Sequence, residues 1–211
     1  RPKSSAASDV YKRQVDNGDL LQGSPMGDYM ADKGIEAGEV HPAYKAMNQL
    51  SYDAANLGNH EFNYGLEFLE ESINDADFPY ISANVYDAET KEHYFTPYII
   101  KTHTFEDTAG VKHEVKVGYI GFVPPQIMTW DKKNLEGKVI ARDIIETANE
   151  LVPQMKAEGA EVIVAIPHSG VSTDPYKNGE ENSTFYLSEV DGIDAIAFGP
   201  VSYTHLTLPT T

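Results

Sequence analysis

The sequence contains no cysteine, so disulfide bonds and thiolate sites are excluded over its 211 residues. It has no apolar run near the roughly 20 residues that a membrane-spanning helix requires. Basic residues are scarce, because 16 Lys and Arg stand against 33 Asp and Glu, and the formal net charge is −17. The absence of cysteine leaves the cellular compartment open, and no signal peptide is visible.

The strong negative charge bears on the class of partner. Nucleic-acid polymers are bound through basic faces, so a net charge of −17 argues against such a polymer. A small phosphate ester stays possible, because bound metal ions can supply positive charge locally. With 41% hydrophobic and 23% charged residues, the composition is globular, and the length fits one domain or a piece of a larger protein.

Helical and strand-like patterns alternate along the chain, which predicts an α/β domain. The apolar periodicity predicts helices over 42–50, 65–76, 143–159 and 182–190. Apolar runs predict strands over 52–57, 80–85, 94–103, 114–122, 161–167 and 193–198. Residues 22–38 are predicted to form a loop with a short helix.

Three polar stretches follow strand-like runs, and they are the most informative part of the sequence. The longest is Asn56-Leu57-Gly58-Asn59-His60-Glu61-Phe62-Asn63-Tyr64-Gly65, with 16–19 upstream and 167–170 downstream. Ligands of α/β sheets bind beyond the carboxyl ends of the strands. A lone Gly-Asn-His is more typical of a strand-to-helix turn with a capping Asn. Three such stretches together favour a ligand site, with Asn59 offering an oxygen and His60 a nitrogen.

These stretches carry a family resemblance. Gly18-Asp19, Gly58-Asn59-His60-Glu61 and His168 resemble the calcineurin-like metallophosphoesterases. Two longer stretches, Val15 to Pro25 (VDNGDLLQGSP) and Gly121 to Met128 (GFVPPQIM), are similar to the 2',3'-cyclic-nucleotide 2'-phosphodiesterase/3'-nucleotidase branch. The resemblance runs from about Val15 to Gly199.

The resemblance implies an α/β/β/α sandwich, truncated at both ends, as a partial N-terminal metallophosphoesterase domain over 15–199. Residues 1–14 and 200–211 depart from the family pattern, which has Asp-x-His before the first motif and His-x-His after Phe198-Gly199. We interpret both segments as non-native tails; natural polar tails are the alternative. The family has a separate C-terminal nucleotide-binding domain, which we expect to be absent from the chain as given.

The resemblance also implies a metal site. Asp19 would bridge two divalent metals, and Asn59 and His168 would complete the shell of one of them. Mixed oxygen and nitrogen donors suit Mn, Zn, Co or Fe better than Mg or Ca. Only these three ligands remain for two metals, so we expect a weakly held single metal in the chain as given.

The catalytic residues implied by the family are His60 and Asn63. His60 would stabilise the leaving group or give it a proton, and Asn63 would hold its ring by a hydrogen bond. Glu61 is expected to brace the loop through backbone N–H groups. The histidines outside these stretches are expected to be structural at position 41 and solvated at 93, 103 and 113.

The resemblance therefore implies metal-dependent hydrolysis of 2',3'-cyclic nucleotides to 3'-nucleotides, and of 3'-nucleotides to nucleosides and phosphate, by the intact protein. The substrate would be a small nucleotide, the location extracytoplasmic, periplasmic or at the cell wall, and the chain as given would show little turnover. One alternative is a 5'-nucleotidase or sugar-nucleotide hydrolase of the same superfamily, against which Asn63 and the Pro124-Pro125-Gln126 stretch count. Another is a non-catalytic metal- or ligand-binding domain.

Overall fold

The computed structural model describes residues 13–36 and 38–199. The interpretation of 1–14 and 200–211 as non-native tails concerns segments that, apart from Arg13 and Gln14, lie outside the described residues. In the described part, no helix is both long and apolar enough to cross a membrane.

The first sheet is short and wholly parallel, in the order β1-β2-β3. Its strands are β1 (Val15–Asp16), β2 (Ala54–Asn56) and β3 (Tyr80–Ile81). The α-helices of this half of the chain are α1 (Pro25–Lys33), α2 (Pro42–Met47) and α3 (Leu66–Ile73). Helix α1 begins where Ser24 accepts the N–H of Gly27 at 3.1 Å and Pro25 occupies the first turn, which needs no N–H there.

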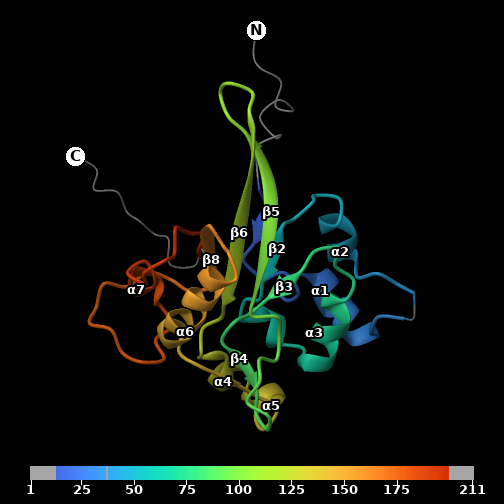
Figure 1. Cartoon of the computed structure of the whole chain (residues 1–211). Helices are drawn as coiled ribbons and strands as arrows, with labels where there is room; N and C mark the ends of the chain where they lie inside the picture. Colours follow the sequence, from blue (N-terminus) through green and yellow to red (C-terminus); the bar gives the residue numbers. More distant parts are fainter. Residues whose placement is uncertain (1–12, 37, 200–211) are drawn as a thin grey trace, which may run out of the picture.

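The second sheet is mixed, in the order β5-β6-β8-β9. Strands β5 (Tyr98–Glu106) and β6 (Lys112–Phe122) form an antiparallel hairpin that extends beyond the body of the molecule (Figure 1). Strands β8 (Val162–Pro167) and β9 (Ala195–Ile196) add in parallel. The chain reaches them through α6 (Ile144–Ala157), which Asp143 caps, and α7 (Thr184–Leu187).

Three apolar clusters define the layers of the fold. One joins the first sheet to its helices and includes Leu57, Phe62 and Leu69. A second joins β6 and β8 to α6 and includes Phe122 and Met155. The third contains residues from the facing strands of both sheets, namely Ala54, Ile81, Val117, Tyr119 and Ile166. Helices therefore cover the outer face of each sheet, and the α/β/β/α sandwich implied by the resemblance is confirmed.

The predicted strand over 80–85 is two strands that belong to different sheets. After β3 the chain leaves the first sheet, and β4 (Val85–Asp87) pairs antiparallel with β7 (Val139–Ala141) in a small third sheet. Between them, Ser82 and Ala83 donate to the carbonyls of Thr96 and Gly121. One continuous apolar run thus serves two sheets, which periodicity could not reveal.

Two one-turn helices, α4 (Ile127–Trp130) and α5 (Lys132–Leu135), follow β6. They lie at the end of the molecule opposite the hairpin (Figure 1), where α4 contacts β7. Asp131 lies at the junction of α4 and α5. The short 3-10 helix η3 (His60–Phe62) follows β2, and its Phe62 carbonyl accepts a hydrogen bond from Asn134 of α5.

Candidate metal and catalytic site

The carboxyl ends of strands from both sheets meet at one edge of the sandwich. Two asparagines hold them together: Asn17, after β1, donates to the carbonyl of Pro167 at 3.0 Å, and Asn56, ending β2, donates to the carbonyl of Phe122 at 2.8 Å. Since Phe122 and Pro167 are paired residues of β6 and β8, the two sheets are fixed to each other at this edge. The loops that carry Asp19, His60 and His168 begin here.

Glu61 braces these loops, as the sequence predicted. Its buried carboxylate accepts the backbone N–H groups of Asp19, Leu20, Leu21 and Gly58 at 2.6 to 3.1 Å. Carboxylates that accept several N–H groups bind them strongly, because each bond is charge-assisted. The loop after β1 is thereby attached to the loop after β2.

Two glycines allow the loops to approach closely. A Cβ on Gly18 would lie 2.1 Å from the nitrogen of Gly58, and one on Gly58 would lie 2.4 Å from Oδ1 of Asp19 and 2.8 Å from Cε1 of His168. Asp19 itself has φ 66°, a left-handed conformation that is uncommon for a non-glycine residue. The carboxylate of this residue lies beside His168.

Asp19 and His168 meet although they are far apart in the sequence. Asp19 Oδ2 lies 3.1 Å from His168 Nε2, which is buried and faces this carboxylate oxygen. The other ring nitrogen, Nδ1, is 2.6 Å from the carbonyl oxygen of Asn17 and donates to it. The proton on Nδ1 leaves a lone pair on Nε2 directed at a carboxylate oxygen, an arrangement that a cation or a proton completes.

The pKa shifts at this edge of the sandwich agree with a direct interaction between Asp19 and His168. Burial opposes the charged form of His168, yet the carboxylate of Asp19 outweighs it and raises the pKa of the ring. Burial likewise opposes the charged form of Asp19, and His168 together with the N–H of His60 lowers its pKa. Burial raises the pKa of Asp16 to about 6. Asp19 and His168 therefore stabilise each other's charged forms, whereas burial favours the neutral form of Asp16.

The donors fit one metal position better than two. Oδ2 of Asp19 and Nε2 of His168 form the mixed oxygen and nitrogen pair that suits a divalent transition metal. Asn59 is half-buried on the adjoining loop, and its side chain does not cap η3. Over residues 13–36 and 38–199, no cluster of three or more His, Cys, Asp or Glu has a metal-binding arrangement.

His60 and Asn63 form the hydrogen bond that the sequence predicted. His60 Nδ1 and Asn63 Oδ1 are 2.7 Å apart, and the His60 N–H donates to Asp19 Oδ1 at 3.0 Å. His60 is thus held beside the Asp19–His168 pair by its backbone and by its ring. Nδ1 is occupied by Asn63, so Nε2 is the nitrogen left for chemistry.

For the other histidines that the structure describes, the predicted environment is correct at two positions and wrong at two. His41 is 1% exposed and caps α2 by accepting the N–H of Ala43, as expected for a structural residue. His113 is exposed, as predicted. The prediction was wrong for His103, which is buried by the β5–β6 pairing and lies 3.0 Å from the hydroxyl of Tyr119. It was also wrong for His93, which is half-buried with its ring 4.4 Å from that of Tyr86.

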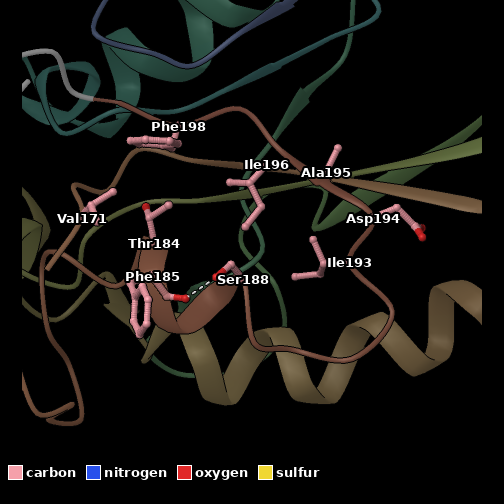
Figure 2. Close-up of a pocket in the computed structure, with 9 residues that line it drawn as sticks. All are labelled: Val171, Thr184, Phe185, Ser188, Ile193, Asp194, Ala195, Ile196 and Phe198. Atoms are coloured by element: carbon pink, nitrogen blue, oxygen red, sulfur yellow. Dashed lines mark hydrogen bonds between the residues drawn. The ribbon is translucent and has the colours of Figure 1, made fainter. Parts of the chain in front are cut away.

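A separate hollow of about 440 Å³ lies at β9 and α7, and neither Asp19, His60 nor His168 lines it (Figure 2). Its lining is largely apolar, with Phe185 and Phe198 exposed at 38% and 49%. Chemistry-bearing residues do not converge there, so the strand-end site is the better candidate.

Three residues important to the site were not singled out from the sequence. Asn17 and Asn56 join the two sheets. Asp131 accepts a hydrogen bond from Nδ2 of Asn63 at 2.9 Å. All three are polar residues beside strands or helix ends, where an ordinary turn role is the default interpretation. Only the three-dimensional pairing reveals what they contact.

Comparison with known proteins identifies what the chain is similar to. Residues 15–199 match the family described as "Calcineurin-like phosphoesterase". The chain is 57% identical over 196 residues to the 2',3'-cyclic-nucleotide 2'-phosphodiesterase/3'-nucleotidase of Yersinia enterocolitica, covering 93% of the chain but 30% of that protein. It is 32% identical over 167 residues to the 5'-nucleotidase of Vibrio cholerae, covering 79% of the chain and 26% of that protein.

A solved structure agrees with these sequence matches. The calcineurin-like phosphoesterase YfkN from Bacillus subtilis superposes with a TM-score of 0.85 at 53% identity, over 89% of this chain and 57% of that one. The chain spans about 30% of the length of its first curated relative.

Proposed function

The chain belongs to the calcineurin-like phosphoesterase family, and on that premise we propose that it forms the metal-binding part of a 2',3'-cyclic-nucleotide 2'-phosphodiesterase/3'-nucleotidase. The whole enzyme would open the cyclic phosphate to a 3'-nucleotide and then release phosphate from that product. The 57% identity to the Yersinia enterocolitica enzyme supports this choice of substrate over others of the family.

One structural observation carries the proposal. Asp19 Oδ2 and His168 Nε2 face each other at 3.1 Å, and Nε2 is buried, at the edge where strands of both sheets end. We propose that these two atoms, together with Asn59, hold a divalent metal. When bound, the metal would activate a water molecule and neutralise charge on the phosphate oxygens.

The residues of the chain would do the remaining work. His60 stands next to Asp19 with Nε2 free, while Nδ1 is bonded to Asn63. In the first step, a water molecule would add to phosphorus and release one proton to solvent, and the bond from phosphorus to O2' would break. A proton on Nε2 of His60 would pass to O2', and His60 would regain a proton from solvent before the next step. In the second, the bond to O3' breaks in the same manner. General acid catalysis of this kind contributes about 10²–10⁴-fold.

A non-catalytic binding domain is the second candidate, and it is favoured by the small donor set of the described residues. Asp19, Asn59 and His168 suffice for one metal, whereas the family resemblance implies two. We therefore propose weak binding of a single metal and little turnover by the 211-residue chain. We also propose that the domain runs from residue 15 to residue 199 and that the segments beyond these limits are non-native tails.

The test compares two proteins: the 211-residue chain, and the protein encoded by the gene when it is read again from source DNA across both ends. Each is loaded with Mn²⁺ and assayed on 2',3'-cyclic AMP, 3'-AMP and 5'-AMP, with Asp19→Asn as the inactive control. Release of 3'-AMP and then phosphate from the cyclic substrate by the second protein supports the proposal. Preference for 5'-AMP would favour a 5'-nucleotidase, and binding without turnover would favour the binding domain.

The proposed extracytoplasmic location rests on the family resemblance alone. Fractionation of the source organism, with an antibody against residues 13–199, tests it. Recovery of the protein with cytoplasmic markers would contradict the location and leave the activity untouched.

A further inference from the structure

Asp131 is a buried acidic residue that the proposed chemistry does not use. It is 4% exposed at the junction of α4 and α5. Oδ1 accepts a hydrogen bond from Nδ2 of Asn63 at 2.9 Å, whereas Oδ2 is buried without any hydrogen-bond partner. Burying a carboxylate with so few partners is costly, so its contact with Asn63 calls for an explanation beyond packing.

The chemistry of the three groups fixes their orientation. The hydrogen bond runs from Nδ2 of Asn63 to Oδ1 of Asp131, so the NH₂ group of the Asn63 amide faces Asp131. The amide oxygen of Asn63 then faces His60 Nδ1 at 2.7 Å. An amide oxygen only accepts, so the proton of a neutral His60 ring must be on Nδ1.

We propose that Asp131 is a positioning residue that fixes, through Asn63, the orientation and tautomer of His60. The proposal rests on the function proposed above, in which Nε2 of His60 is the working nitrogen. After Nε2 gives up its proton, the ring is left in the Nδ1–H form that Asn63 accepts. Without Asp131 the Asn63 amide could reverse, and the ring could adopt the Nε2–H form.

The same helix supports the loop in a second way that can be separated from the first. Asn134 of α5 donates from Nδ2 to the carbonyls of Phe62 and Asn63, both at 3.0 Å. These bonds hold the backbone of the loop but do not touch the His60 ring. Asn134 therefore provides a matched control: its loss should loosen the loop without removing the acceptor for the Asn63 amide.

The experiment reads the tautomer of His60 directly in the metal-free 211-residue chain. Histidine side chains are labelled with ¹⁵N, and long-range ¹H–¹⁵N correlation spectra are recorded about two pH units above the ordinary histidine pKa of about 6.5. The signals of His60 are assigned by their loss in His60→Gln. Spectra are compared among the wild type, Asp131→Ala, Asp131→Asn and Asn134→Ala.

We expect the wild type and Asn134→Ala to show the Nδ1–H tautomer almost entirely. Asp131→Ala should shift a large share to Nε2–H, and Asp131→Asn should restore the wild-type pattern because its amide oxygen still accepts. An Nε2–H wild type would overturn the proposal on its own, even if Asp131→Ala fails to fold. Three other results would also overturn it. They are an unchanged tautomer in Asp131→Ala, an equal tautomer shift in Asn134→Ala, and failure of Asp131→Asn to restore the wild-type tautomer. Because hydrolysis is not measured, failure of the proposed function would leave this result interpretable.

Discussion

Glu61 accepts the backbone N–H of Asp19 on Oε2, with 2.7 Å between nitrogen and oxygen. The same oxygen accepts the N–H of Gly58 at 2.6 Å. One carboxylate therefore sets the distance between the loop that carries Asp19 and the loop that carries His60. The position of the candidate metal ligand depends on a residue that does not itself face the metal.

Glu61→Gln should lower the free energy of unfolding by about 1–3 kcal/mol, because the amide NH₂ cannot accept and leaves buried N–H groups unpaired. Urea denaturation measures this change. Glu67→Gln, which removes the same charge from an exposed position on α3, is the control. Equal stability of the two variants would show that the buried bonds contribute little.

Asp19→Asn and His168→Gln should each weaken Mn²⁺ binding by at least about tenfold, or ~1.4 kcal/mol. Each variant removes one of the two atoms that face each other at 3.1 Å. Titration followed by the electron paramagnetic resonance of free Mn²⁺ gives the affinities. Asp32→Asn, on the exposed surface of α1, should bind as the wild type does; a similar loss there would indicate a general charge effect.

Gly58→Ala should damage the same site by steric contact. The new Cβ would lie 2.4 Å from Asp19 Oδ1 and 2.8 Å from His168 Cε1, so these side chains must separate. We expect weaker Mn²⁺ binding by calorimetry. Gly23→Ala, where φ is 113° and no atom lies within 4 Å of the new Cβ, introduces strain without contact and should leave the affinity unchanged.

His60→Ala in the hydrolysing protein should lower turnover about 10²–10⁴-fold, as expected for loss of a general acid. Metal content should stay at the wild-type value, because the His60 ring bonds to Asn63 and not to Asp19. Turnover measured alongside elemental analysis separates the two effects. Loss of metal together with activity would make His60 a ligand instead.

Acid should destabilise the fold through His103. Burial lowers the pKa of this ring, although Asp53 opposes the shift. With the folded pKa below the unfolded value of about 6.5, the unfolded chain binds the proton more readily, so stability is present above that pH and declines below it. In His103→Gln, unfolding free energies at pH about 7.5 and about 5.5 should differ less than in the wild type; an unchanged difference would rule His103 out.

The sequence predicted the parts of the site that local patterns encode. Glu61 was expected to brace its loop, the family resemblance implied the bond between His60 and Asn63, and both contacts are present. The sandwich followed from the family resemblance and not from periodicity, which indicated only an α/β domain. The roles of Asp19, Asn59 and His168 as metal ligands stay predictions.

Contacts between distant segments escaped prediction. The residues around Asn17 and Asn56 do not indicate that the two amides donate to the carbonyls of Pro167 and Phe122 on the other sheet. The environment of His103 depends on Tyr119, which is its neighbour only after β5 and β6 pair. Asp131 was not singled out from the sequence, because its partner Asn63 lies 68 residues earlier.

Asp19 and His168 belong to loops on different sheets, so their meeting has a consequence for how the chain matures. The pair forms only after β8 has docked beside β6 and Asn17 has reached Pro167. Bringing two such distant segments together costs more chain entropy than forming local contacts, so we expect this pair to form late in folding. A nascent chain whose second half has not assembled cannot offer this ligand pair, so metal capture at the edge would report that assembly is complete.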